Sequence, residues 1–127
     1  QITFDESQII LTDNVVLFDE KLKLLFAQNK LDAIFALDEH ASVSGLKLAL
    51  HNGYKVPENL SIIGFADGVW SRRLTPSLST VSQHGPEIGE TAARLLIERL
   101  ESKNEENPYK TITVKTELRY RDSTRNV

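Results

Sequence analysis

The sequence predicts an α/β fold of three layers, in which helices cover both faces of a mainly parallel sheet. Short apolar runs of strand length alternate along the chain with longer segments whose apolar residues recur at helical spacing. The connections between these segments are short, which favours right-handed parallel crossovers. A chain of 127 residues that is 40% hydrophobic and 26% charged can form one domain with an ordinary core.

The first half of the chain supplies the strands and helices of a parallel unit. Leu22 and Phe26 belong to the apolar stripe of the first helix, and Asp19 is its expected cap. Asn52 and Gly53 are expected to end the second helix, because both residue types tolerate left-handed backbone. The expected elements are a strand at 9–11, a helix over 19–29, a strand at 33–37, a helix over 39–52 and a strand at 60–65.

The second half is predicted to add a strand, a helix with a buried stripe, and a closing strand at the sheet edge. Residues 70–75 are expected to be irregular, since Pro76 disfavours helix in the residue before it. Pro86 suits the first turn of a helix that begins after Gly85. The expected elements are a strand at 78–82, a helix with the stripe Ile88, Ala92, Leu95, Leu96 and Leu100, a polar loop over 102–108, and a strand over 111–120.

Acidic residues follow two neighbouring strands of the predicted sheet. Asp38 comes after the strand at 33–37, and Asp67 comes after the strand at 60–65. The carboxyl ends of parallel strands meet at one edge, where open α/β sheets bind their ligands. We therefore expect these two carboxylates to share one hollow.

Composition excludes several classes of function. The formal net charge of -3 and the pI of about 5.6 provide no basic field to hold a phosphate backbone. The chain has no cysteine, no apolar run long enough to span a bilayer and no signal-peptide pattern. It starts at Gln1 and lacks methionine, as expected of a piece of a longer protein.

No catalytic or metal centre is predicted. His40 and His51 are eleven residues apart, which separates them by roughly 16 Å along a helix and prevents shared coordination. His84 has no ligand set around it in the sequence. A hydrolase on a doubly wound sheet is disfavoured because no nucleophile elbow, phosphate loop or carboxylate pair with a named base is visible. We expect no cofactor.

Five blocks of sequence resemble, in order and spacing, the effector-binding region of lactose-repressor-type (LacI/GalR) transcription regulators. The likeness covers residues from about 19 to 124. One such block would be a weak signal, whereas five ordered blocks are a strong one. The blocks are DAIFALDE (32–39), GYKVPENLSIIGFAD (53–67), TPSLSTVSQ (75–83), IGETAARLL (88–96) and RYRDST (119–124).

The resemblance implies a periplasmic-binding-protein-like, Rossmann-like core of two subdomains that closes on a small molecule and forms a homodimer. Residues 1–76 and 108–127 would then belong to the carboxyl-terminal subdomain, and residues 77–107 would cross into the amino-terminal one. Operator DNA would be bound by a helix-turn-helix headpiece that is not in this chain. The helix after Gly85 would lack its usual sheet, so its stripe would pack differently, swap with a second copy, or dimerise.

The resemblance and the predicted rim of the sheet together supply a set of candidate ligand-binding residues. Asp38 lies where the family usually has an effector-binding asparagine, with a helix cap as the alternative role. Gln83 matches a glutamine that reaches the cleft, with hinge hydrogen bonding as the alternative. Relatives commonly carry an aspartate at the position of Ala66. Here either the ligand is less polar on that side, or Asp67 or Asp38 takes over, or the site binds nothing. Phe65 and Trp70 could stack on a ring or simply pack.

Two further residues match positions that face the partner subunit in relatives. These are Val43 and Leu74, and ordinary core packing is the alternative for both. The predicted function is effector sensing and dimerisation in a cytoplasmic LacI-type regulator, with a sugar or related metabolite as the effector. The alternative is a sugar-binding protein of a transport system. Neither an enzyme nor a membrane protein is predicted.

Overall fold

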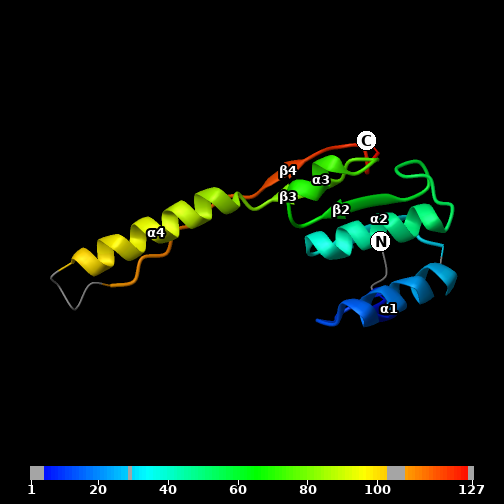
Figure 1. Ribbon diagram of the computed structural model, residues 1–127, viewed down its shortest axis with the longest axis horizontal. Helices are drawn as coiled ribbons and strands as arrows, with labels where there is room; N and C mark the ends of the chain where they lie inside the picture. Colours follow the sequence, from blue (N-terminus) through cyan, green and yellow to red (C-terminus); the bar gives the residue numbers. More distant parts are fainter. Residues whose placement is uncertain (1–4, 29, 103–107, 126–127) are drawn as a thin grey trace.

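A small sheet, two helices packed beside it and a long helical arm make up the molecule (Figure 1). The computed structural model describes residues 5–28, 30–102 and 108–125. The elements are η1 (Glu6–Gln8), α1 (Val15–Gln28), β1 (Ala33–Ala36), α2 (Glu39–His51), β2 (Ser61–Gly64), α3 (Val69–Arg73), β3 (Ser79–Ser82), α4 (Gly85–Glu101) and β4 (Glu117–Arg119).

The sheet has the strand order β1-β2-β3-β4. The pairs β1/β2 and β2/β3 are parallel, and β4 runs antiparallel to β3. Ile34 lies beside Ile62, and Thr80 lies beside Arg119. The predicted class, α/β with a mainly parallel sheet, is confirmed.

The core lies between the sheet and α2. α2 contacts both β1 and β2, and α1 packs against α2. α2 lies close to the sheet at Gly45, where a Cβ would make an ordinary contact with Ile34 at 3.8 Å. The buried hydrophobic cluster consists of Leu22, Phe26, Leu31, Leu46, Leu48, Ala49, Val56, Leu60, Ile62 and Leu78.

α2 begins and ends almost where the sequence predicts. Asp38 is its N-cap, and the Asp38 carboxylate accepts a hydrogen bond from the backbone N–H of Ala41 at 2.8 Å. Asn52 is the C-cap, and Gly53 follows with a φ of 79°, a left-handed conformation that favours glycine. Local capping chemistry therefore determines this helix.

The first and last elements differ from the predictions. Residues 9–11 form no strand, because in the described chain no neighbouring strand pairs with them. α1 starts at Val15 rather than Asp19, since the side chain of Asn14 accepts from the Leu17 N–H at 3.1 Å and caps the helix. Its predicted last residue, Asn29, is outside the described residues.

Two later elements also differ. Residues 70–75 were expected to be irregular, but Val69–Arg73 form the short helix α3. The closing strand covers only Glu117–Arg119 instead of 111–120, because β3 ends at Ser82 and offers no partner further along. The predicted polar loop over 102–108 lies mostly outside the described residues.

α4 forms where predicted, but the expected burial of its apolar stripe is wrong. The helix projects from the end of the sheet (Figure 1), and none of its residues is buried. Leu96 and Leu100 are 58% and 76% exposed. The segment that starts at residue 108 lies against it, through Lys110 Nζ to Glu98 at 3.1 Å and through Arg99 over the ring of Tyr109. None of the described helices is both long and apolar enough to cross a bilayer.

Close packing of α2 on β2 gives a first testable prediction. A Cβ added at Gly64 would lie 2.4 Å from Oγ and 3.3 Å from Cβ of the buried Ser42, whose hydroxyl donates to the carbonyl of Asp38. We expect Gly64→Ala to lower the free energy of unfolding by about 1–3 kcal/mol through overpacking. Denaturant titration followed by circular dichroism measures this change.

Two further variants make that test specific. Ser42→Ala removes the nearer clashing atom, so the double variant Gly64→Ala/Ser42→Ala should lose less stability than the two single changes added together. Gly89→Ala on α4 is the matched control, because nothing lies within 4 Å of a Cβ there. It should leave stability unchanged or raise it. Strict additivity of Gly64→Ala and Ser42→Ala would refute the packing argument.

Candidate functional site

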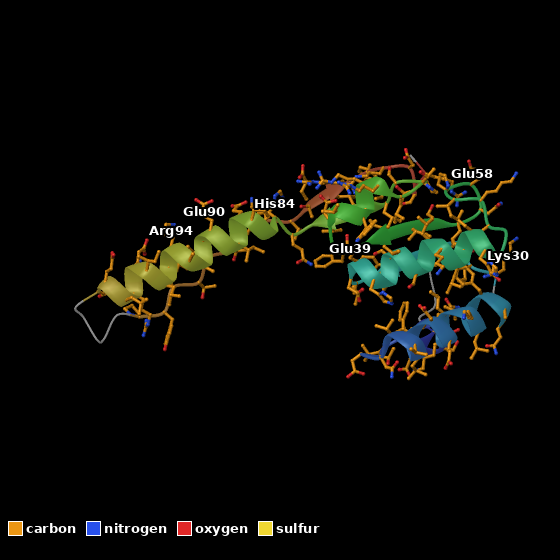
Figure 2. The ribbon with its side chains drawn as sticks, viewed as in Figure 1. Lys30, Glu39, Glu58, His84, Glu90 and Arg94 are labelled. Atoms are coloured by element: carbon orange, nitrogen blue, oxygen red, sulfur yellow. The ribbon has the colours of Figure 1, made fainter. Side chains whose placement is uncertain are left out.

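A hollow of about 490 Å³ lies at the carboxyl ends of β2 and β3, where the chain crosses into α4. Its walls come from the turn after β2, from α3, from the start of α4 and from β4. Figure 2 shows His84 at the point where α4 leaves the sheet. The hollow is lined by Ala66, Asp67, Arg72, Ser82, Gln83, His84, Gly85, Pro86, Glu87 and Arg119.

Asp67 forms the buried floor of this hollow. Its side chain is 5% exposed. Oδ1 accepts hydrogen bonds from Arg121 Nη2 at 2.5 Å and from Thr80 Oγ1 at 2.9 Å, and Oδ2 accepts from Arg119 Nη1. Arg121 also donates through Nη1 to Thr80 Oγ1 at 3.0 Å. The carboxylate is therefore engaged by the protein itself.

The environment of Asp67 favours its ionised form. Burial alone raises the pKa of the carboxyl group. The hydrogen bonds from Arg121, Thr80 and Arg119, together with the positive charge of Arg121, more than offset burial, so the pKa lies below its ordinary value. Asp67 thus carries a negative charge that two guanidinium groups balance.

Two of the other predicted residues meet at the crossover. Gln83 Nε2 donates to the backbone carbonyl of Phe65 at 3.0 Å, which joins the end of β2 to the segment between β3 and α4. The bond is of the kind expected for the hinge role that the sequence left open as an alternative for Gln83, and both roles stay predictions. Trp70 is 58% exposed as a whole residue and does not line the hollow.

Asp38 and Asp67 do not share one hollow. Asp38 lines a separate, largely apolar hollow of about 470 Å³ that is bounded by residues 8–12, α1 and β1. One of its oxygens is used to cap α2. The rim predicted from the two strand ends is therefore divided between two hollows, because Asp38 turns to its own helix and Asp67 turns to the arginines.

Several residues of the site were not predicted from the sequence. Arg119, Arg121 and Thr80 surround Asp67, and His84 adopts a left-handed backbone with φ 53° and lies 3.7 Å from Glu117. Arg119 and Arg121 are two residues apart in an extended segment, which places them on one side of it. This alternation beside an acidic strand end was the available signal.

The predicted partner-facing residues are partly within the protein's own packing. Val43 lies half-buried on α2, and Leu74 packs against the hydrophobic cluster just after α3. Among residues 5–28, 30–102 and 108–125, no group of three or more histidine and carboxylate side chains is placed to hold a metal ion.

An open parallel sheet with a polar hollow at its carboxyl end is the arrangement of a ligand-binding α/β domain. The sequence model of the periplasmic binding protein-like domain matches residues 9–124, and the chain belongs to this family. Its relatives are LacI-type transcription regulators rather than enzymes, which confirms the resemblance described above.

Three relatives illustrate the match. The chain is 35% identical over 105 residues to the HTH-type transcriptional regulator MalR of Clostridium butyricum, covering 83% of this chain and 30% of the relative. It is 30% identical over 100 residues to the ribose operon repressor of Haemophilus influenzae, covering 79% and 30%. A LacI family regulator from Arthrobacter sp. FB24, solved in complex with lactose, is 25% identical with a TM-score of 0.76, covering 92% and 44%. The chain thus spans about 30% of the curated relatives' length.

The buried charge of Asp67 gives a second prediction. Asp67→Asn removes the acceptor charge beside two arginines and should lower the free energy of unfolding by about 2–3 kcal/mol at pH 7. Because the folded-state pKa of Asp67 is lowered, its contribution is present above the unfolded pKa of about 4 and is lost as the pH falls through the folded value.

The difference in stability between wild type and Asp67→Asn should therefore shrink below about pH 4. Urea unfolding at several pH values measures it. The exposed Asp13 provides the control, since Asp13→Asn should change stability by less than about 0.5 kcal/mol at any pH. A constant difference across the acid range would contradict the role given to Asp67.

Proposed function

We propose that this chain is the effector-sensing and dimerisation part of a LacI-type transcription regulator. A small molecule bound at the crossover would change operator binding by a helix-turn-helix headpiece elsewhere in the protein, which acts in the cytoplasm. The family match over residues 9–124, together with a hollow at that crossover, carries this proposal. A transport-system binding protein shares the fold, but the three relatives named above are regulators.

The position of the hollow suits a sensor with two moving parts. Ala66 and Asp67 belong to the turn after β2, whereas Gln83 to Glu87 belong to the crossover and to α4. A ligand in the hollow would touch both and stabilise one relative arrangement over another, which is what a population shift requires. We assign residues 1–76 and 108–127 to one subdomain and 77–107 to the crossing part. The uncovered stripe of α4 supports this division.

A sugar or related metabolite is the proposed effector. The Arthrobacter relative was solved with lactose. In this chain Gln83, Arg72 and Glu87 line the hollow with side chains that can bind hydroxyl groups. Ala66 offers only a methyl group, so the sugar would be less polar on that side. Operator contact is assigned to the headpiece, because the net charge of -3 gives this chain no basic field.

The test is a gel shift with the full-length protein and its own promoter DNA. We expect DNA binding that changes when the sugar with the largest thermal stabilisation is added, chosen from neutral mono- and disaccharides that include lactose and ribose. Binding of a sugar without any DNA binding would instead favour the transport alternative. The absence of both would remove the proposal.

Asp38 lies outside the crossover hollow, so its predicted ligand role needs a separate test that distinguishes it from capping. Asp38→Ser keeps a capping oxygen for the Ala41 N–H but removes the carboxylate. If Asp38 binds the effector, this variant should weaken sugar binding about tenfold in calorimetry while the melting temperature stays within a few degrees. Asp32→Ser, at the other end of β1, is the control and should bind normally. Unchanged affinity in Asp38→Ser would show that Asp38 caps α2 and does not bind the effector.

The proposed dimer can be tested at Val43, which is half-buried on α2. Placing a charge there with Val43→Glu should weaken dimerisation of the full-length protein roughly a hundredfold, because the charge would be buried without a partner. Sedimentation equilibrium measures the dissociation constant. Lys23→Glu on the exposed side of α1 is the control. An unaltered dimer in Val43→Glu would place the interface elsewhere.

A further inference from the structure

Glu39 links two parts of the site that are distant in the sequence. It lies in the first turn of α2, directly after Asp38, where a role in that helix alone is the simple expectation. Its carboxylate instead points to α3, and Oε1 accepts a hydrogen bond from the backbone N–H of Trp70 at 3.2 Å, 31 residues away. Figure 2 shows Glu39 at the end of α2 that faces the crossover.

α3 depends on an acceptor from outside its own segment. Its N-cap is Gly68, which makes no side-chain capping hydrogen bond. The first N–H groups of any helix lack partners within the helix, so one of those in α3 is satisfied by Glu39. The bond is charge-assisted and so stronger than a neutral one.

The absence of a side chain at Gly68 makes room for this carboxylate. A Cβ built there would lie 1.9 Å from Oε1, 2.4 Å from Cδ and 2.6 Å from Oε2 of Glu39. The φ of Gly68 is -77°, which alanine adopts without strain. Glycine at position 68 is therefore explained by the space that the Glu39 carboxylate occupies, and not by backbone conformation.

From these contacts we infer that Glu39 is a positioning residue that holds α3, and with it the Arg72 wall of the hollow, against the start of α2. This inference depends on the proposed function in one respect only, namely that the hollow binds a ligand. Arg72 lines the hollow, and Asp67 lies in the turn that leads into α3. Glu39 thus couples the end of β1, where Asp38 lies, to the wall of a hollow in which Asp38 takes no part.

The test uses Trp70, the only tryptophan in the 127 residues. Glu39→Ala should speed hydrogen exchange of the Trp70 amide at least about tenfold, the equivalent of one charge-assisted hydrogen bond, and should lower its fluorescence anisotropy. Glu39→Gln keeps an acceptor oxygen of the same reach and should largely restore both signals. Glu39→Asp is too short by one methylene and should not. A loss of overall stability alone would not produce this pattern.

Gly68→Ala gives an independent route to the same state. It should displace the Glu39 carboxylate and reproduce the Glu39→Ala signals, and the double variant should be no worse than either single one. Glu58→Ala, at an exposed position near the opposite end of the sheet, is the control (Figure 2). Exchange at Trp70 that is unchanged in Glu39→Ala, or additive effects in the double variant, would overturn the inference.

These measurements need neither a ligand nor operator DNA. Circular dichroism shows in parallel that each variant is folded. A negative result would remove the role of Glu39 while leaving the gel shift and sugar binding to decide the proposed function. Conversely, a chain that binds no sugar would still show the Glu39 signals at Trp70.

Discussion

The arrangement of the crossover depends on the carboxylate of Asp67. It lies just after β2 and binds the guanidinium groups of Arg119 and Arg121, which are 52 and 54 residues further along the chain. Thr80 of β3 donates to the same carboxylate, so one side chain joins β2, β3 and the closing segment. Because the group is almost excluded from water, each of these bonds is stronger than a surface contact, and losing a partner would leave an uncompensated charge. The junction lies beside the antiparallel pair of β3 and β4, in which Thr80 is the partner of Arg119.

Two serine side chains also link β2, β3 and the residues after β4. Ser123 and Ser79 are both fully buried. Ser123 Oγ donates to the carbonyl of Ile62 at 2.6 Å and accepts from the N–H of Ser79 at 2.8 Å, so it bridges β2 and β3. A hydroxyl group can do both at once, and serine is small enough to lie between two strands. The residues after β4 are consequently hydrogen-bonded to the strands of the sheet.

The parts of the fold set by local chemistry could be predicted from the sequence. The start of α2 follows from the Asp38 cap, its end from Asn52 and Gly53, and the parallel strands from apolar runs between helices. α3 was missed because its acceptor is Glu39, which no local pattern connects to Trp70. The prediction that Asp38 and Asp67 share one hollow was wrong for a similar reason. Strand ends predict where carboxylates lie, but not whether a carboxylate turns to its own helix, as Asp38 does, or to distant arginines, as Asp67 does.

The side chains that were predicted to bind a ligand are largely engaged within this chain. Asp67 is held by arginines, the Gln83 amide nitrogen by Phe65, and one Asp38 oxygen by α2. The floor of the crossover hollow is therefore preorganised, since Asp67 and Gln83 are held in place by hydrogen bonds within the protein. Selectivity for the proposed effector would then come from residues around that floor. On one side Ala66 presents a methyl group, and on the others Arg72, His84 and Glu87 present polar groups. A ligand matched to this hollow would place an apolar edge against β2 and its polar groups toward α3 and α4. Its contact with α4 would then affect the position of that helix relative to the sheet.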